Sequence, residues 1–273
     1  MIKMVLLDMD ETLLVDFHVP LINQQAIKKA REQKVYITPA TGRSFALIQE
    51  ILKEMGTKDC KGEYSICFNG GAIYENCSSE PLYYRALDYE QVRSIYEVCE
   101  KNDLCFMAFS LDKIFMYRPS ESEIARKTKQ KADFVIETDL TCLKDQKIIK
   151  AVIQSDHEEQ LYEIGLQEAQ RFEKEKIEVS FSSGRFMECT SKGVSKGSAL
   201  HWIKDYLHLE IDEIMAVGDN FNDIEMLKEA GLGVCVGDGR QEAKEAADQV
   251  TERGYRDGAV AEALERFVLH AEE

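Results

Sequence analysis

Hydrophobic and polar positions follow two different rhythms along this chain, and the change of rhythm divides it into blocks. In the first block, short apolar runs alternate with stretches in which apolar residues recur every three or four positions, as expected for strands alternating with helices. The expected strands are 4–7, 35–37 and 64–68, and the expected helices are 21–33 and 45–52. This alternation predicts a parallel sheet with helices on its faces.

After Gly71 the alternation gives way to hairpin-like pairs of strands separated by amphipathic segments. The expected strands are 73–74, 82–84, 104–109, 114–117, 148–154, 177–181 and 185–189, and the expected helices are 88–101, 121–130 and 158–172. We interpret residues 83–187 as a separate α+β module with a mixed sheet, inserted into the first block. From Ser191 the first rhythm returns, so residues 1–82 and 188–273 are predicted to form one α/β domain.

Composition narrows the class of protein. The chain has 273 residues, of which 44% are hydrophobic and 31% charged, and it is long enough to bury a sizeable core. No stretch approaches the roughly 20 apolar residues of a membrane span, and the first residues do not resemble a secretory signal, so we expect a cytoplasmic protein. A formal net charge of -16 argues against nucleic acid and anionic membranes as partners. The eight cysteines form no C-x-x-C pair, which favours reduced thiols over a zinc site or disulfides.

Four groups of polar residues lie where predicted strands end or a predicted helix begins. They are Asp8, Asp10 and Thr12; Thr41 and Arg43; Lys196; and Asp219, Asn222 and Asp223. Each group alone has an ordinary structural explanation, as a solvated loop, a turn, a surface lysine or a helix cap. Ligands of open parallel sheets bind outside the carboxyl ends of the strands, so the four groups together predict one site. Two carboxylates one residue apart need a cation, a shared proton or hydration, and a Mg²⁺ ion there would suit a phosphate substrate.

The order of these residues resembles the four motifs of the haloacid dehalogenase superfamily of phosphohydrolases. The motifs read Asp8-x-Asp10-x-Thr12, Thr41, Lys196 and Gly218-Asp219-x-x-Asn222-Asp223. Further phrases resemble the Cof-type branch of this superfamily: Asn69-Gly70-Gly71, Gly193-Val194-Ser195-Lys196-Gly197, Ala247-Asp248-x-Val250-Thr251 and Asp257-Gly258-Ala259-Val260. The resemblance implies a Rossmann-like parallel core and a cap formed by the inserted module, which would exclude water and select the leaving group.

The resemblance also implies catalytic and phosphate-binding roles. Asp8 would be the nucleophile that forms an aspartyl-phosphate, and Asp10 would protonate the leaving alcohol and then activate water. Thr41, Lys196 and Asn222 would bind the phosphoryl group and balance the charge that moves during transfer.

The same resemblance implies a metal site. Mg²⁺ would lie between Asp8, the backbone carbonyl of Asp10 and Asp219. Thr12 would hold the loop, and Asp223 would orient the surroundings of the metal or the motif lysine.

Three positions depart from the family pattern or leave it ambiguous. Glu11 stands where the family most often has glycine, which bears on the flexibility of the loop. Lys192 is an alternative to Lys196 as the motif lysine, but the glycine and helix that follow favour Lys196. Gly237-Asp238-Gly239 replaces the usual glycine, asparagine and alanine, and it lacks the spacing of a dinucleotide-binding loop.

The motifs leave the substrate open. Arg43, beside Thr41, and Arg185, in the last hairpin of the inserted module, are possible contacts to the rest of the substrate or ordinary surface arginines. The preferred function is a Mg²⁺-dependent phosphatase acting on a small phosphorylated metabolite, with a sugar phosphate as the expected class. Two alternatives stay open: a phosphosugar mutase or phosphotransferase, and a catalytically weak regulator that binds a phosphometabolite. We expect a monomer or a weak homodimer.

Overall fold

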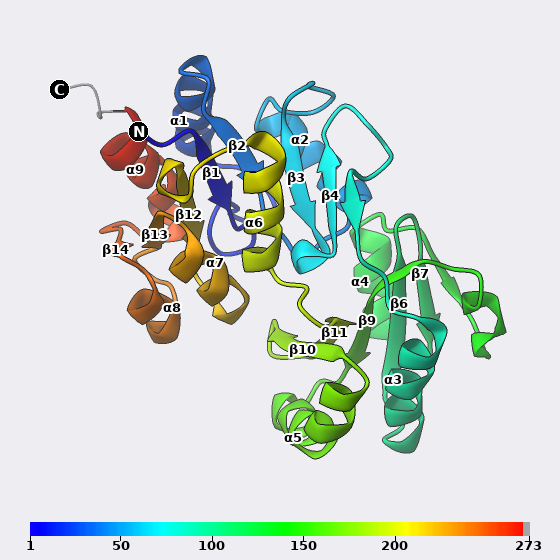
Figure 1. The fold of residues 1–273 in the computed structure, drawn as a ribbon. Coiled ribbons are helices and arrows are strands. Elements are labelled where there is room, and N and C mark those ends of the chain that lie inside the picture. Colours follow the sequence, from blue (N-terminus) through cyan, green and yellow to red (C-terminus); the bar gives the residue numbers. More distant parts are fainter. Residues whose placement is uncertain (270–273) are drawn as a thin grey trace. The chain divides into compact units, whose positions relative to one another are not determined.

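The computed structural model describes residues 1–269, and the chain divides into two units (Figure 1). The core unit comprises Met1–Tyr83 together with the chain from Ser195 onward, and the inserted unit comprises Tyr84–Val194. This division confirms the predicted α/β class, in which a parallel core sheet carries an inserted α+β module. Among residues 1–269, no helix has the length and apolar character needed to cross a bilayer.

The core unit is built on a five-stranded parallel sheet. In spatial order its strands are β14 (Gln249–Val250), β13 (Leu232–Cys235), β12 (Ile214–Gly218), β1 (Met4–Leu7) and β2 (Tyr36–Pro39). All four residues of β1 are buried, as expected for a central parallel strand with helices on both faces. The strand predicted at 4–7 is therefore confirmed.

Helices cover both faces of this sheet. Those of the core unit are α1 (Leu21–Glu32), α2 (Gln49–Glu54), α6 (Lys196–Leu207), α7 (Ile224–Glu229), α8 (Gln241–Ala246) and α9 (Ala259–Leu264). On one face, Met4 and Leu6 of β1 share a hydrophobic cluster with Leu200 of α6 and Leu227 of α7. Helices α1 and α9 pack against each other. Among the described residues, neither helix contributes a side chain to the cluster of Met4 and Leu6, so both cover the opposite face of the sheet (Figure 1).

The order of the strands reverses beside β1. The chain passes from β1 through α1 to β2 on one side, whereas β12 returns much later and pairs with the other side of β1. Leu7 lies opposite Val217 in this pairing, so Asp8 and Asp219 follow the ends of neighbouring strands. Open α/β sheets bind their ligands at such a reversal of strand order, so the sequence-predicted groups lie at the expected edge.

The third predicted strand of the first block does not join the five-stranded sheet. β3 (Tyr64–Cys67) instead joins β4 (Ala72–Glu75) and β5 (Tyr83–Tyr84) in a three-stranded sheet and runs antiparallel to β4. One bridge links Ala40 to Ile66, where the N–H of Thr41 donates to the carbonyl of Ile66 at 2.9 Å. Pro39 carries no N–H at the preceding position on that side of β2, which explains why β2 and β3 separate.

The inserted unit has its own six-stranded mixed sheet, as predicted. In spatial order its strands are β10 (Ile177–Ser182), β11 (Phe186–Ser191), β9 (Ile148–Gln154), β6 (Cys105–Ser110), β7 (Ile114–Tyr117) and β8 (Phe134–Ile136). Helices α3 (Tyr89–Lys101) and α5 (Glu158–Lys174) share a hydrophobic cluster with one face of this sheet. On the other face, α4 (Glu121–Lys129) places the ammonium of Lys127 over the rings of Phe109 and Phe186.

The inserted unit extends further along the chain than the sequence predicts. The predicted range is 83–187, whereas the unit runs from Tyr84 to Val194. The reason is β11, which pairs with β10 along its whole length and with β9 from Phe186 to Cys189. This strand belongs to the sheet of the inserted unit, so the chain returns to the core unit only after Val194.

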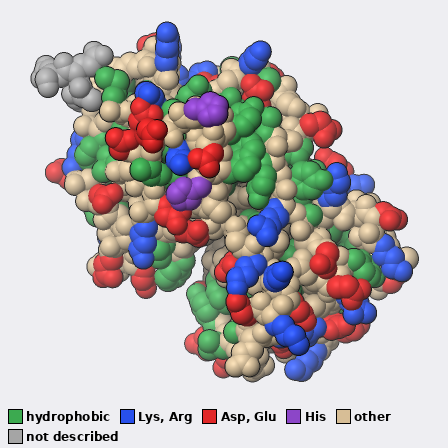
Figure 2. Space-filling model, viewed as in Figure 1, with side chains coloured by type: hydrophobic (Ala, Val, Ile, Leu, Met, Phe, Trp, Pro, Cys, Tyr) green, Lys and Arg blue, Asp and Glu red, His purple; other side chains and the backbone are tan. Residues whose placement is uncertain are grey.

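The charged surface residues and the state of the cysteines agree with what the composition indicates. Acidic and basic side chains are interspersed over the face drawn in Figure 2, and no single basic surface dominates that face. All eight cysteines lie within the described residues and are unpaired, as predicted. Burial raises the pKa of Cys105 to about 12, so this thiol stays protonated and unreactive at neutral pH.

Candidate active site

Asp8 and Lys196 form an ion pair at the carboxyl end of the core sheet. Asp8 follows β1 directly, and its N–H donates to the carbonyl of Val217 at 2.9 Å, which fixes it against β12. Lys196 is the first residue of α6, and its side chain is fully buried. Its Nζ donates to Oδ1 of Asp8 and, at 2.6 Å, to Oδ1 of Asp223. A lysine at a helix N-terminus opposes the helix dipole, so these two carboxylates stabilise the ammonium there.

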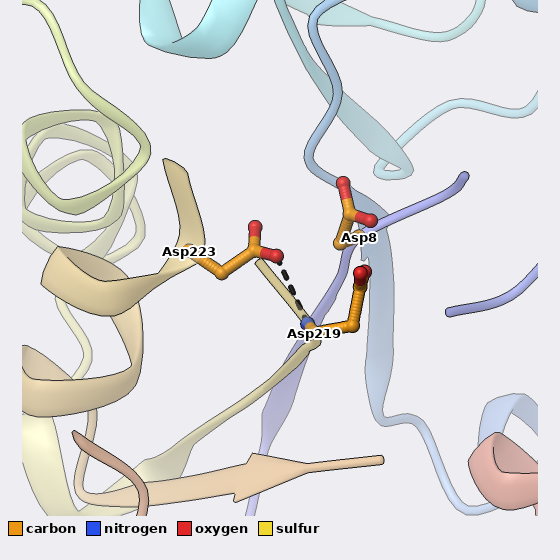
Figure 3. A group of neighbouring side chains, drawn as sticks. All are labelled: Asp8, Asp219 and Asp223. Carbon is orange, nitrogen blue, oxygen red and sulfur yellow. Dashed lines mark hydrogen bonds between the residues drawn. The ribbon is translucent and has the colours of Figure 1, made fainter. Parts of the chain in front are cut away.

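Asp223 organises the loop that follows β12. Its Oδ2 accepts hydrogen bonds from the N–H groups of Asp219 and Asn220, both at 3.0 Å, and Figure 3 shows the first of these bonds. Gly218 makes this packing possible, because a Cβ at that position would lie 2.6 Å from the Cβ of Asp223. Since Oδ1 accepts from Lys196, both oxygens of Asp223 are bound by donors of the protein itself.

Asp219 connects the loop after β12 with the loop after β1. Its carboxylate points toward the side chain of Asp8 in Figure 3, and the ligand atoms of Asp8, Asp219 and Asp223 all lie within 4.8 Å of one another. The hydroxyl of Thr12 donates to Oδ1 of Asp219 at 2.6 Å. Thr12 is fully buried, so this bond is shielded from water and fixes the orientation of the Asp219 carboxylate.

Crowding and burial dominate the electrostatics of this cluster. Burial raises the pKa of Asp8 well above its ordinary value; the charges of Asp223 and Asp219 add to this increase, while Lys196 acts against it. Burial and the charge of Asp223 also raise the pKa of Asp219 to about 7. Burial by itself lowers the pKa of Lys196, but the charges of Asp223 and Asp8 together outweigh it and raise that pKa. The lysine is therefore an ammonium at neutral pH.

The donor set of this cluster fits a divalent cation such as Mg²⁺. One buried ammonium faces three buried carboxylates, so the cluster carries more negative charge than the lysine balances. Carboxylate oxygens are the hard ligands that Mg²⁺ prefers. Asp8 and Asp219 are best placed to hold the ion, because Asp223 already accepts three hydrogen bonds. The side chain of Asp10 lies outside this cluster of described carboxylates, so only its backbone carbonyl is a candidate ligand.

Asp10, Thr41 and Arg43 form a second group, in the loops after β1 and β2. Nε of Arg43 donates to Oδ2 of Asp10 at 3.0 Å, and Nη2 donates to Oδ1, so the guanidinium binds both carboxylate oxygens. The N–H of Arg43 donates to the hydroxyl of Thr41 at 3.2 Å. Thr41 is buried, whereas the side chain of Asp10 is 57% exposed. The acid–base candidate is thus tied to the phosphate-binding candidate through Arg43.

Asn222 contacts a residue for which the sequence analysis assigns no role. Its Nδ2 donates to Oδ1 of Asn69 at 3.3 Å, and the N–H of Asn69 donates to the carbonyl of Thr41 at 2.8 Å. Asn69 has a left-handed backbone (φ 55°), which asparagine tolerates better than most residues. Gly70 follows with a φ of +99°, and a Cβ there would lie 2.1 Å from the carbonyl oxygen of Ser195. The Asn-Gly dipeptide marks a turn in the sequence, but only the fold places it beside Asn222.

Arg185 is occupied within the inserted unit. Its Nη2 donates to Oδ1 of Asp156 at 3.0 Å and lies 3.6 Å from a carboxylate oxygen of Glu123, and its guanidinium lies over the ring of Phe186.

The structure separates the predicted site residues of the core unit into two groups. One contact network joins Asp8, Thr12, Lys196, Asp219 and Asp223; a second joins Asp10, Thr41, Arg43 and, through Asn69, Asn222.

Comparisons with known proteins match nearly the whole chain. Residues 5–264 match a family model described as haloacid dehalogenase-like hydrolase. A 5-amino-6-(5-phospho-D-ribitylamino)uracil phosphatase of Bacillus subtilis is 29% identical over 269 residues, which cover 98% of this chain and 96% of that protein. A phosphoglycolate phosphatase of Methanosarcina acetivorans is 30% identical over 266 residues, which cover 96% of this chain and 95% of that protein. A solved haloacid dehalogenase-like hydrolase from Bacteroides thetaiotaomicron is 25% identical, with a TM-score of 0.86 over 97% of this chain and 99% of the other.

Proposed function

The chain belongs to the haloacid dehalogenase-like hydrolases, and from this premise we propose that it is a Mg²⁺-dependent phosphatase of small phosphorylated metabolites that works through an aspartyl-phosphate. The observation that carries the proposal is the buried ion-pair network around Asp8. Lys196, which Asp223 also binds, holds this carboxylate at the reversal of strand order, with Asp219 beside it. Such a network supplies a fixed nucleophile, a phosphate-binding ammonium and carboxylates for a cation.

Formation of the aspartyl-phosphate is the first step of this proposal. A carboxylate oxygen of Asp8 attacks phosphorus, the bond from phosphorus to the leaving oxygen breaks, and Asp10 gives that oxygen a proton. Lys196 and Thr41 donate to the phosphoryl oxygens, whose charge the site must stabilise during transfer. Asn222, whose Nδ2 donates one hydrogen bond to Asn69, would donate its second N–H to the same phosphoryl group.

Hydrolysis of the aspartyl-phosphate is the second step. Water attacks phosphorus, Asp10 takes a proton from that water, and the bond from phosphorus to Asp8 breaks to release inorganic phosphate. The proton that Asp10 gave in the first step is recovered in the second, so the enzyme returns to its starting state.

Asp8, Asp219 and the backbone carbonyl of Asp10 are the residues proposed to hold Mg²⁺. When bound there, the ion would polarise the phosphoryl oxygens and offset their negative charge. The hydrogen bond from Thr12 fixes Asp219 for this role, and Asp223 orients Lys196.

A sugar phosphate is the proposed class of substrate. Both curated relatives named above are phosphatases of small phosphorylated compounds, and the first acts on a compound with a phosphorylated ribityl chain. The inserted unit would select the leaving group, and Arg185 is its candidate contact, since 27% of that side chain is exposed. A reducing cytoplasmic location is proposed from the eight unpaired cysteines.

Substitution of Asp8 by asparagine tests the proposed nucleophile. Phosphate release from an aryl phosphate and from a panel of sugar phosphates should require Mg²⁺ in the wild type and should disappear in Asp8→Asn. Asp205→Asn is the matched control, because Asp205 is exposed and pairs only with the neighbouring Lys204 among the described residues. Retained turnover in Asp8→Asn would exclude Asp8 as the nucleophile, and full activity in EDTA would exclude the metal requirement.

The fate of the phosphoryl group separates hydrolysis from the alternatives. The wild type should give inorganic phosphate even when a polyol is added at high concentration. Transfer of most of the phosphoryl group to that polyol would identify a phosphotransferase. Tight binding of a phosphometabolite with negligible Mg²⁺-dependent phosphate release would identify a regulator.

A further inference from the structure

The guanidinium of Arg43 binds the carboxylate of Asp10 in a geometry that fixes its direction. Two separate N–H groups of Arg43 reach the two oxygens of Asp10, one of them from Nε at 3.0 Å. Such a two-armed contact sets the plane of the carboxylate as well as its distance. Asp10 needs this support, because its side chain is 57% exposed and would otherwise rotate freely in solvent.

Arg43 is itself held from two sides. Its N–H donates to the hydroxyl of Thr41 at 3.2 Å, and its carbonyl accepts from the N–H of Phe68 at 3.0 Å, which anchors its backbone to the phosphate-binding candidate and to the end of β3. Its guanidinium lies 5.4 Å from the centre of the Phe17 ring. This contact is a cation–π interaction, and only 19% of the Arg43 side chain remains exposed.

Phe17 is presented to Arg43 by a tight hairpin. Val15 and His18 exchange two backbone hydrogen bonds, at 2.9 and 3.0 Å, so Asp16 and Phe17 form a two-residue turn. Both turn residues have positive φ, 48° and 70°, a conformation that phenylalanine rarely adopts. This unfavourable backbone holds an aromatic ring, 56% exposed, against the guanidinium. Its placement at a strained turn points to a role in the site.

We propose that Arg43 is a positioning residue for Asp10: its two-armed contact, supported by the Phe17 ring, fixes the carboxylate that exchanges a proton with the leaving oxygen. This inference rests on the proposed phosphatase function. A general acid or base acts only within hydrogen-bond reach of the atom it serves, and a misplacement of about 1 Å can cost about 100-fold in rate. Because Arg43 is anchored to Thr41, the contact fixes Asp10 relative to the bound phosphate.

The dependence of the rate on the leaving group tests this role. An alkoxide leaves from phosphorus only with a proton, whereas nitrophenolate leaves without one, so loss of Asp10 should affect alkyl phosphates far more than p-nitrophenyl phosphate. The quantity compared is kcat/KM, which reports the formation of the aspartyl-phosphate. Arg43→Ala should lower kcat/KM about 100-fold for an alkyl phosphate and less than about tenfold for p-nitrophenyl phosphate. Asp10→Asn should show the same preference.

Further variants distinguish positioning from charge and from structure. Arg43→Lys keeps the charge but loses the two-armed contact, so it should recover little of the alkyl phosphate activity. The double variant Asp10→Asn with Arg43→Ala should be no slower than Asp10→Asn alone, because both changes remove one function. Phe17→Leu should cost about two- to fivefold with the same leaving-group preference. Arg31→Ala is the control, since Arg31 pairs with Glu63 at 2.6 Å and has a similarly exposed side chain, at 25%.

Four outcomes would overturn the inference. Equal losses on both substrates in Arg43→Ala would assign a general structural role. Losses that multiply in the double variant, or that appear mainly in KM and grow with the charge of the substrate, would assign Arg43 to substrate contact. A wild type that turns over neither substrate would overturn the proposed function and this inference with it, whereas the first three outcomes leave the proposed function standing.

Discussion

Replacing Lys196 by methionine removes the ammonium that lies between Asp8 and Asp223 while keeping most of the buried aliphatic chain. The three carboxylates would then face one another without that counter-charge in a buried site. Removal of one partner from a buried ion pair costs about 3–5 kcal/mol, because the remaining charge stays uncompensated. Each kcal/mol of lost stability lowers the unfolding temperature of a domain of roughly this size by about 2–4 °C. The unfolding temperature of Lys196→Met should therefore be about 6–20 °C below that of the wild type.

The fluorescence of Trp202 gives an assay specific for the core unit. This side chain is the only tryptophan of the chain and lies on α6, the helix that begins at Lys196. Urea and thermal unfolding should be followed in EDTA, so that a bound cation cannot replace the missing charge. Lys204→Met is the matched control, because Lys204 lies on the same helix, is partly exposed and pairs with the exposed Asp205. It should cost less than about 1 kcal/mol.

A double variant makes the explanation refutable. Asp223→Asn keeps an oxygen that can accept from the N–H groups of Asp219 and Asn220, but it removes one of the uncompensated charges. Lys196→Met combined with Asp223→Asn should therefore lose clearly less stability than the sum of the two single variants. A loss below about 1 kcal/mol in Lys196→Met, or full additivity in the double variant, would show that the lysine does not stabilise this cluster by charge.

Three further predictions concern other parts of the fold. Gly70→Ala should destabilise the core unit by more than about 2 kcal/mol in urea unfolding, because the new Cβ would clash with the carbonyl of Ser195. Gly62→Ala is the control: Gly62 also has a positive φ but has open space around it, so this change should cost only about 1–2 kcal/mol. In the inserted unit, Glu123→Leu should cost about 3–5 kcal/mol, since it leaves the buried ammonium of Lys127 without its carboxylate. Lys127→Met should cost less, because Glu123 keeps Arg126 at 3.3 Å and Arg185 at 3.6 Å. The double variant should lose less stability than the sum of the two, and additive losses would contradict this. Burial lowers the pKa of Lys127 from 10.5 to about 8, so between pH 8 and pH 10.5 the unfolded chain binds a proton that the folded chain does not. In this range the free energy of unfolding of the wild type should rise by up to about 1.4 kcal/mol per pH unit more than that of Lys127→Met. Parallel stability profiles of the two proteins against pH would refute this prediction.

The sequence predicted the edge of the sheet where the site forms. Buried apolar runs that give way to carboxylates mark strand ends, and Asp8 and Asp219 were identified in this way. Which strands are neighbours depends on pairing over long distances, and no local pattern shows that Thr12 donates to Asp219. The motif order supplied that information only through a resemblance to a family.

Other features could not be predicted, because they depend on contacts between residues that are far apart in the sequence. The boundary predicted at 187 is too early, because it divides the strand expected at 185–189, and no local pattern shows that this strand also pairs with β9. Strands β8 and β14 have three and two residues, too short for a period to appear. Phe17 lies between the strand expected at 4–7 and the helix expected at 21–33, and its contact with Arg43 depends on a turn in an unfavourable backbone conformation. Pro39 was a usable signal that β3 leaves the parallel sheet, because proline cannot complete the ladder.

The pairing of β1 with β12 has a consequence for how the chain is made. Synthesis proceeds at about 5–20 residues per second, so roughly ten to forty seconds separate the appearance of β1 from that of β12 on the ribosome. During this interval β1 is apolar on both faces and has one edge without its partner, a situation that favours association with other chains. The sheet and the hydrophobic cluster of the inserted unit consist of residues from 84–194 alone, so this unit can fold before β12 is available to pair with β1. Truncation after Val194 would therefore release a folded inserted unit attached to an aggregation-prone strand.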